Sequence, residues 1–363
     1  MSEAYELARL LTFIKDTLKE YSNECVKVPV EVMELLENEL DCINKYKDLN
    51  EENRDFEFWT IMSNLREKYR EDVKFGFEGK EVVVKAEELA VKIELLNEKL
   101  RLGLERALQE NDGIMPTYFY YEAEEYEVIE NDSQKIEDES KDKYVKVLKF
   151  KQRKMPLFLE GVVRGFKIYN DKEFLRGIYN KVRNSGLFDN KLNMYKVNAS
   201  LENETIEIGR ARAFTPGWLE NESIWLHMEY KYMLEVLKGG LYKEYYDDFR
   251  KVIIAFMDPD VYGRSPLENS SFIASSANLD ESIHGTGFVA RLSGATAEFL
   301  SMWRLMFAGK QPFAVRNGKL TLSFNPVLPE WLFDEENKVS FNFLGKCLVT
   351  YHNPSRKIPM KWI

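Results

Sequence analysis

The sequence predicts a mainly α-helical protein with β additions. Over most of its 363 residues, apolar side chains recur every three or four positions, which is the spacing of one helix face. Strands do not alternate with helices as they do in parallel α/β proteins, and no heptad pattern is sustained. Short segments that alternate polar and apolar residues occur near residues 118–150 and past Gly309. These observations favour an antiparallel helical array with small β attachments.

The first part of the chain divides into an N-terminal helical region at residues 1–115 and a β region at residues 116–154. Residues 118–129 and 144–150 predict the strands of a hairpin, because they are rich in aromatic and β-branched side chains. Residues 131–143 between them are almost wholly polar and predict a solvated loop. Four segments of the helical region have helical periodicity: Tyr5–Tyr21, Val28–Lys45, Phe56–Tyr69 and Ala86–Gln109.

Helical periodicity returns in residues 155–312, the region in which we expect the functional site. Residues 313–363 predict a small C-terminal β unit, with short strands in Leu320–Phe324 and Val339–Thr350 bounded by glycine and proline turns. The helices expected in the site region are Leu157–Phe166, Glu173–Val182, Trp218–Leu237, Tyr242–Met257 and Ala295–Phe307.

Composition and charge argue against several classes of function. The net charge of -10 argues against a nucleic-acid partner, since such binding needs a basic stripe. No apolar run approaches the length of a membrane span and no signal-peptide pattern is present, so a cytoplasmic protein without a membrane partner is expected. Three cysteines and three histidines are too scattered for a metal site, which predicts reduced thiols and no metal or cofactor.

Residues 209–227 are the first segment that carries binding chemistry. Thr215 and Pro216 suit the N-cap and the first position of a following helix, whose free N–H groups would face the preceding loop. Trp225 suits an apolar platform, although its helical spacing is equally typical of a core residue. The segment also offers side chains that suit a polyhydroxylated or anionic ligand: Arg210, Arg212, Glu220 and Asn221.

Residues 258–296 form the second such segment. They read as a long loop, rich in hydroxyl and amide groups, between two strongly helical stretches, and long loops of this kind are commonly functional. Arg264 and His284 lie within it. At its end Ser293 can cap a helix and Gly294 lets a ligand approach the backbone, which favours an anion such as phosphate.

The order of these motifs resembles the C-terminal half of the catalytic barrel in cellobiose phosphorylase and related inverting β-glucan phosphorylases. The likeness extends over roughly residues 155–313. It implies part of an (α/α)6 six-hairpin barrel, in which inorganic phosphate attacks a β-linked disaccharide or oligosaccharide with inversion. The motifs that carry it are Thr-Pro-Gly at 215–217, Glu-Asn at 220–221, His227 and Ser-Gly at 293–294.

The resemblance also implies roles for particular residues. His227, Ser293 and Gly294 match phosphate-binding positions, and Glu220 resembles the glutamate that contacts the acceptor-side sugar. Where the family usually has two glycines after Glu-Asn, this chain has Glu222 and Ser223, which suggests a divergent subgroup. Five further candidates rest on chemistry and location alone: Arg210, Arg212, Asn221, Arg264 and His284.

The catalytic acid of the family is missing from this chain. The family's aspartate lies in an Asp-Trp-Asn-Asp-like loop, and no such sequence occurs here, so the acid is expected upstream of Met1. The chain is therefore expected to be a phosphorylase part that joins an N-terminal partner segment or a homo-oligomer. Inorganic phosphate would be its co-substrate.

Two alternatives stay open at this stage. One is a noncatalytic carbohydrate- or phosphate-binding protein that keeps the pocket without the acid. The other is a glycoside hydrolase on a reduced α/α barrel, which needs two facing carboxylates. The carboxylates that suit this role are Glu220, Glu222, Glu268 and Asp258.

Overall fold

The computed structural model describes residues 1–49, 53–129, 144–290 and 294–355. The chain forms two compact units, Met1–Met155 and Pro156–Ile363, each with its own helices and small antiparallel sheets. Within the described ranges, no helix is both long enough and apolar enough to cross a membrane. The fold is mainly α-helical with β additions, as expected.

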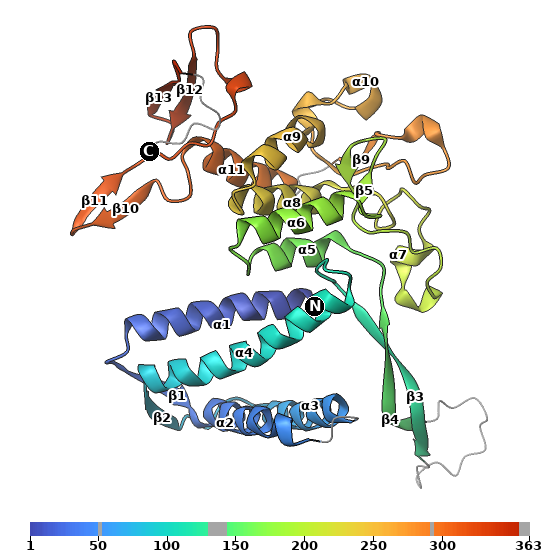
Figure 1. Ribbon diagram of the computed structural model, residues 1–363, viewed down its shortest axis with the longest axis vertical. Helices are drawn as coiled ribbons and strands as arrows, with labels where there is room; N and C mark the ends of the chain where they lie inside the picture. Colours follow the sequence, from blue (N-terminus) through green and yellow to red (C-terminus); the bar gives the residue numbers. More distant parts are fainter. Residues whose placement is uncertain (50–52, 130–143, 291–293, 356–363) are drawn as a thin grey trace. The chain divides into compact units, whose positions relative to one another are not determined.

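The first unit is built on two helices that run in opposite directions, α1 (Ser2–Glu20) and α4 (Ala86–Glu110), which lie side by side in Figure 1. Their contact buries small and aromatic side chains such as Tyr5 and Ala90. Helix α2 (Val30–Lys45) packs against α4 and against α3 (Arg54–Asp72). Strands complete the unit as two antiparallel pairs: β1 (Cys25–Pro29) with β2 (Glu81–Lys85), and β3 (Phe119–Ile129) with β4 (Tyr144–Lys154).

The predicted helices and hairpin of this unit are confirmed, with ends that differ from the predicted ones by up to four residues. Helix α2 begins at Val30 because Val28 and Pro29 belong to β1. The β1–β2 pair was not predicted, since each strand has only five residues and its partner is distant in the sequence. The expected loop at residues 131–143 lies outside the described residues.

The second unit is organised around α8 (Leu226–Lys238), which packs against α5 (Leu159–Phe166), α9 (Tyr242–Val252) and α11 (Gly294–Phe307) (Figure 1). Ten of the thirteen residues of α8 are buried, as befits a helix with neighbours on several sides. Helix α6 (Lys172–Arg183) joins α9 through an ion pair between Arg176 and Glu244.

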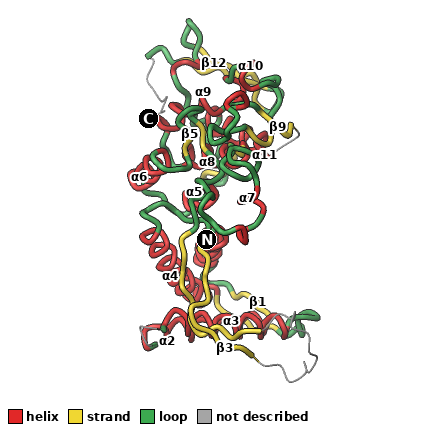
Figure 2. Tube along the Cα trace, turned by 90° about the vertical axis from the view of Figure 1, so that its right-hand side faces the viewer, coloured by secondary structure: helices red, strands yellow, loops and turns green. Residues whose placement is uncertain are grey.

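Small elements surround these helices, as the tube in Figure 2 shows. A three-stranded antiparallel sheet has the order β7 (Ile224–Trp225), β8 (Ser270–Ile273), β9 (Gly287–Ala290). The C-terminal part forms two hairpins, β10 (Phe313–Arg316) with β11 (Lys319–Leu322) and β12 (Lys338–Phe343) with β13 (Cys347–His352). The remaining short elements of this unit are β5 (Phe188–Asp189), β6 (Met194–Tyr195), α7 (Arg210–Ala213), α10 (Pro259–Tyr262), and 3-10 turns at Ile206–Ile208, Ile254–Phe256, Glu281–Ile283 and Glu330–Leu332. A further 3-10 turn, Tyr46–Asp48, belongs to the first unit.

Three expectations for this unit are wrong. The helix predicted from Trp218 begins only at Leu226, so Thr215 and Pro216 open no helix there. The cause is backbone conformation, since Gly217, Leu219 and Glu222 all have positive φ, which a right-handed helix excludes.

The second error concerns residues 258–296, which are not one long loop. They contain α10, β8 and β9, and the two strands bury serine and phenylalanine side chains such as Ser270 and Phe272. The predicted strand Val339–Thr350 is likewise two strands, because Leu344 and Gly345 turn the chain with positive φ.

Candidate functional site

The structure brings His227 and Gly294 into contact. His227 is the second residue of α8, and Gly294 is the first residue of α11. A Cβ added to Gly294 would lie 2.5 Å from the ring Nδ1 of His227, and closer still to Cε1 and Nε2. Only glycine lets the backbone approach the imidazole this closely. The N-termini of two packed helices therefore meet at one imidazole, a geometry that suits an anion.

Glu298, one turn further along α11, completes this cluster. Its Oε1 lies 3.5 Å from Nε2 of His227, and both side chains are only partly exposed, at 20% and 26%. The hydrogen bond from His227 lowers the pKa of Glu298, against the opposing effect of burial. The indole of Trp225 meets the imidazole edge to face at 6.0 Å. Glu298 thus orients the ring of His227.

Sequence reasoning missed Glu298, although a signal was present. A residue four positions after Gly294 lies on the same face of the helix that Gly294 opens. Ser293, the other expected phosphate ligand, lies outside the described residues.

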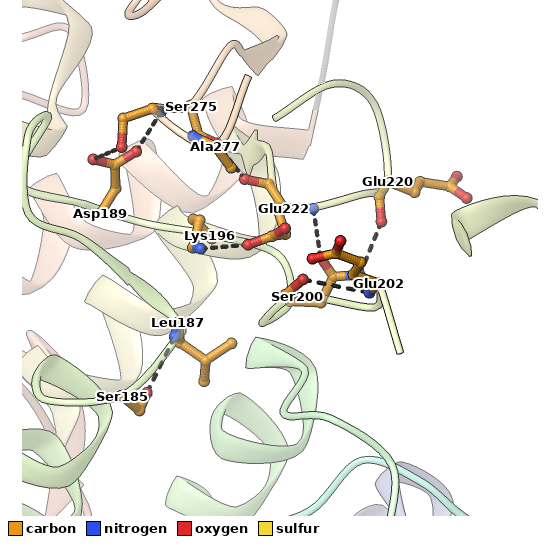
Figure 3. Close-up of polar contacts among 12 residues, drawn as sticks. Ser185, Leu187, Asp189, Lys196, Ser200, Glu202, Glu220, Glu222, Ser275 and Ala277 are labelled. Carbon is orange, nitrogen blue, oxygen red and sulfur yellow. Dashed lines mark hydrogen bonds and ion pairs between the residues drawn. The ribbon is translucent and has the colours of Figure 1, made fainter. Parts of the chain in front are cut away.

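Glu220 is held by an arginine rather than by the His227 cluster. Its carboxylate accepts two hydrogen bonds from the guanidinium of Arg210, from Nε at 2.9 Å and from the terminal nitrogen at 2.7 Å. The pair is well exposed, with 75% of the Arg210 side chain accessible, so a ligand can displace it at low cost. Figure 3 shows the Glu220 carboxylate directed away from that of Glu222.

Glu222 is part of the scaffold. It is buried and forms a 2.8 Å ion pair with Lys196 (Figure 3). The amide of Asn198 accepts a 2.5 Å bond from the Glu222 N–H and donates a 3.0 Å bond to the Glu220 carbonyl. The hydroxyl of Ser275 donates to the Glu222 carbonyl at 2.5 Å. These bonds hold the turn that carries Glu220 in its irregular conformation.

Asn221 and Arg212 hold loops. Asn221 is buried and its Nδ2 donates to the Phe214 carbonyl at 2.7 Å, while its Oδ1 has no hydrogen-bond partner among the residues that the structure describes. Arg212 donates to the backbone carbonyls of Glu202 and Glu204, at 2.8 and 3.3 Å. Both candidates therefore have structural partners.

Arg264 and His284 also stabilise backbone. Arg264 donates to the Gly287 carbonyl at 2.8 Å, and His284 has its Nε2 2.7 Å from the Asn278 carbonyl and its Nδ1 2.8 Å from the ammonium of Lys191. In the described part of the chain, neither has a hydrogen bond or ion pair with the His227 cluster.

The four carboxylates considered for hydrolysis all have partners. Asp258 caps α10 by accepting from the Asp260 N–H at 2.9 Å, and Glu268 lies 3.8 Å from Arg264. Glu220 and Glu222 form the ion pairs described above. The described residues include no group of His, Cys, Asp and Glu side chains with metal-binding geometry.

Aromatic rings join the two expected segments. Trp218 stacks on Phe288 with centroids 3.7 Å apart and planes 2° from parallel. Phe288 continues to Phe272 at 5.5 Å, and Phe272 to Trp225 at 6.2 Å. The two tryptophans therefore belong to an apolar cluster, and Trp225 connects that cluster to His227.

Comparison of the sequence with protein-family models and with curated proteins finds no match.

Proposed function

We propose that this chain is part of an inverting carbohydrate phosphorylase of the glycosyltransferase class. The observation that carries the proposal is the contact between the His227 imidazole and the Gly294 backbone at the start of α11. His227, Gly294 and Ser293 would hold inorganic phosphate, and Glu220 would contact the acceptor-side sugar of a β-linked gluco-oligosaccharide or disaccharide. The resemblance of residues 155–313 to this family supplies the reaction type.

The cluster has the properties that phosphate requires. Two helix N-termini supply partial positive charge, and Glu298 orients the imidazole at the same point. Since Nε2 faces Glu298, Nδ1 is the ring nitrogen left to donate to a phosphate oxygen, and within the described ranges it has no hydrogen-bond partner.

In the proposed reaction a phosphate oxygen forms a bond to the anomeric carbon as the glycosidic C–O bond breaks on the opposite face. The products are an inverted sugar 1-phosphate and a shortened saccharide. A general acid must protonate the leaving oxygen, and the proposal assigns that acid to residues outside this chain. Helices α5, α6, α8, α9 and α11 would be the part of a six-hairpin barrel that this chain contributes.

A noncatalytic carbohydrate- or phosphate-binding protein is the second candidate. It is favoured by the partners of Asp258, Glu220, Glu222 and Glu268, each of which already has a structural contact. The same observation gives a glycoside hydrolase less support, because that mechanism needs two opposed carboxylates available for acid and base or nucleophile.

The test is phosphate-dependent release of glucose 1-phosphate from a panel of β-linked glucose disaccharides and oligosaccharides, combined with calorimetric phosphate binding. His227→Ala is the test variant, and His284→Ala is the matched control. Turnover lost only in His227→Ala supports a phosphorylase. Phosphate binding without turnover, weakened only by His227→Ala, supports a phosphate site without an acid in this chain, which is expected of a phosphorylase part and of the binding protein alike. Phosphate binding unchanged by His227→Ala contradicts the proposed site.

A further inference from the structure

The second unit contains a pocket of about 760 Å³ outside the His227 cluster. It lies between the first turns of α9 and residues 329–337, which lead into β12. Figure 1 labels α9 and β12. It shares no lining residue with the His227 cluster. Its volume is in the range of small-molecule binding sites, about 300 to 1,000 Å³.

One wall of the pocket is a braced aromatic surface. Trp331 lines it and is 38% exposed. The indole packs against Phe249 and Phe256, at 6.2 and 5.8 Å between centroids, and the guanidinium of Arg250 lies 5.4 Å from its ring centroid. These contacts fix the indole, so its exposed surface is a preformed apolar platform. Two more aromatic residues, Tyr242 and Phe333, line the same pocket.

The polar lining offers both acceptors and a donor. Asp247 and Lys243 project from α9, four positions apart, and in the described part of the chain neither side chain has a hydrogen bond or ion pair. Asp334 faces them from the other side of the pocket, and its Oδ1 accepts from the backbone N–H of Glu336 at 2.9 Å and of Lys338 at 2.8 Å. The carboxylate of Asp334 is therefore held in place.

We infer that this pocket binds a neutral oligosaccharide. An apolar platform surrounded by carboxylates and an ammonium group matches a sugar ring, which has apolar faces and hydroxyl groups that both donate and accept. An anion is disfavoured, since Asp247 and Asp334 outnumber Lys243. The same excess of carboxylates would attract a quaternary ammonium ligand, so tetramethylammonium is the competing ligand in the test below. The inference does not depend on phosphorolysis at His227.

The test uses the full chain labelled with 5-fluorotryptophan, whose Trp331 fluorine signal is identified by its loss in Trp331→Phe. The chain is titrated with cellotetraose, laminaritetraose, maltotetraose and chitotetraose without phosphate. At least one should shift the Trp331 signal saturably. Asp247→Ala should weaken that binding about five-fold, the effect of one lost hydrogen bond. Lys251→Ala on the same helix, exposed and outside the pocket, is the matched control.

Three outcomes overturn the inference. They are a Trp331 signal that none of the four sugars shifts, saturable binding that Asp247→Ala leaves unchanged, and tighter binding of tetramethylammonium than of any sugar. His227→Ala separates this site from the proposed phosphate site, because it should leave the Trp331 response intact whether or not the chain takes part in phosphorolysis.

Discussion

Gly294→Ala is the sharpest test of the candidate phosphate site. The new methyl group would lie 2.5 Å from Nδ1 of His227, well inside normal contact distance, so the imidazole or the start of α11 must move. Overpacking of this kind costs about 1 to 3 kcal/mol of stability. A displaced imidazole also loses a charge-assisted hydrogen bond to phosphate, worth about 1.5 to 3 kcal/mol, or roughly 10- to 150-fold in Kd.

Two measurements test this prediction: calorimetric titration with inorganic phosphate at pH 7 and urea unfolding. The matched control is Gly177→Ala in α6, where an added Cβ meets nothing within 4 Å. That change should leave phosphate binding unaltered and stabilise the protein by up to about 1 kcal/mol through helix propensity. Wild-type phosphate affinity and stability in Gly294→Ala would refute the contact between Gly294 and His227 as the basis of the site.

Three further predictions concern the buried scaffold of the second unit. Burial raises the pKa of Glu229 well above its ordinary value near 4.5, so the folded protein binds more protons than the unfolded chain above that pH. Its unfolding free energy should therefore fall by up to about 1.4 kcal/mol per pH unit as pH rises toward the folded pKa. Glu229→Gln should remove this pH dependence. Equal slopes of unfolding free energy against pH in the wild type and in Glu229→Gln, measured by urea unfolding from pH 5 to 8, would contradict the prediction. Asp248→Ala should lower the unfolding free energy by about 3 to 5 kcal/mol. The reason is that the buried hydroxyls of Tyr179 and Tyr195 and the guanidinium of Arg183 lose the carboxylate that accepts their hydrogen bonds. A loss of under about 1 kcal/mol in urea unfolding would disprove this. Asn198→Ala should lower the unfolding free energy by about 1 to 3 kcal/mol and speed hydrogen exchange at the Glu222 amide. Unchanged exchange there would be inconsistent with Asn198 holding the turn that carries Glu220.

Local pattern was enough to predict most of the helices and the β3–β4 hairpin. The periodicity of Ala86–Gln109 predicted α4 within one residue at its end, because an apolar stripe needs a helix to bury it. The periodicity of Leu157–Phe166 likewise predicted α5, including its final residue, Phe166. The pattern failed between Trp218 and Leu226, where local cap signals favoured a helix.

The reason for that failure is tertiary. Ile224 and Trp225 pair with β8, whose residues lie almost 50 positions later. Asn198, which comes earlier in the sequence, holds the preceding turn through its hydrogen bonds to the backbone of Glu220 and Glu222. Hydrogen bonds of this long range outweigh a local cap, whose contribution is about 1 kcal/mol.

For the candidate site, too, some features follow from the sequence and others only from the tertiary structure. The sequence by itself determined which chemistry was present: a histidine, a Ser-Gly helix start and a Glu-Asn pair in a given order. Only the tertiary structure decided that the His227 imidazole touches the Gly294 backbone and that Glu298 faces it. The physical reason is that this contact depends on how α8 and α11 pack, and helix periodicity specifies which face is buried but not which other helix covers it.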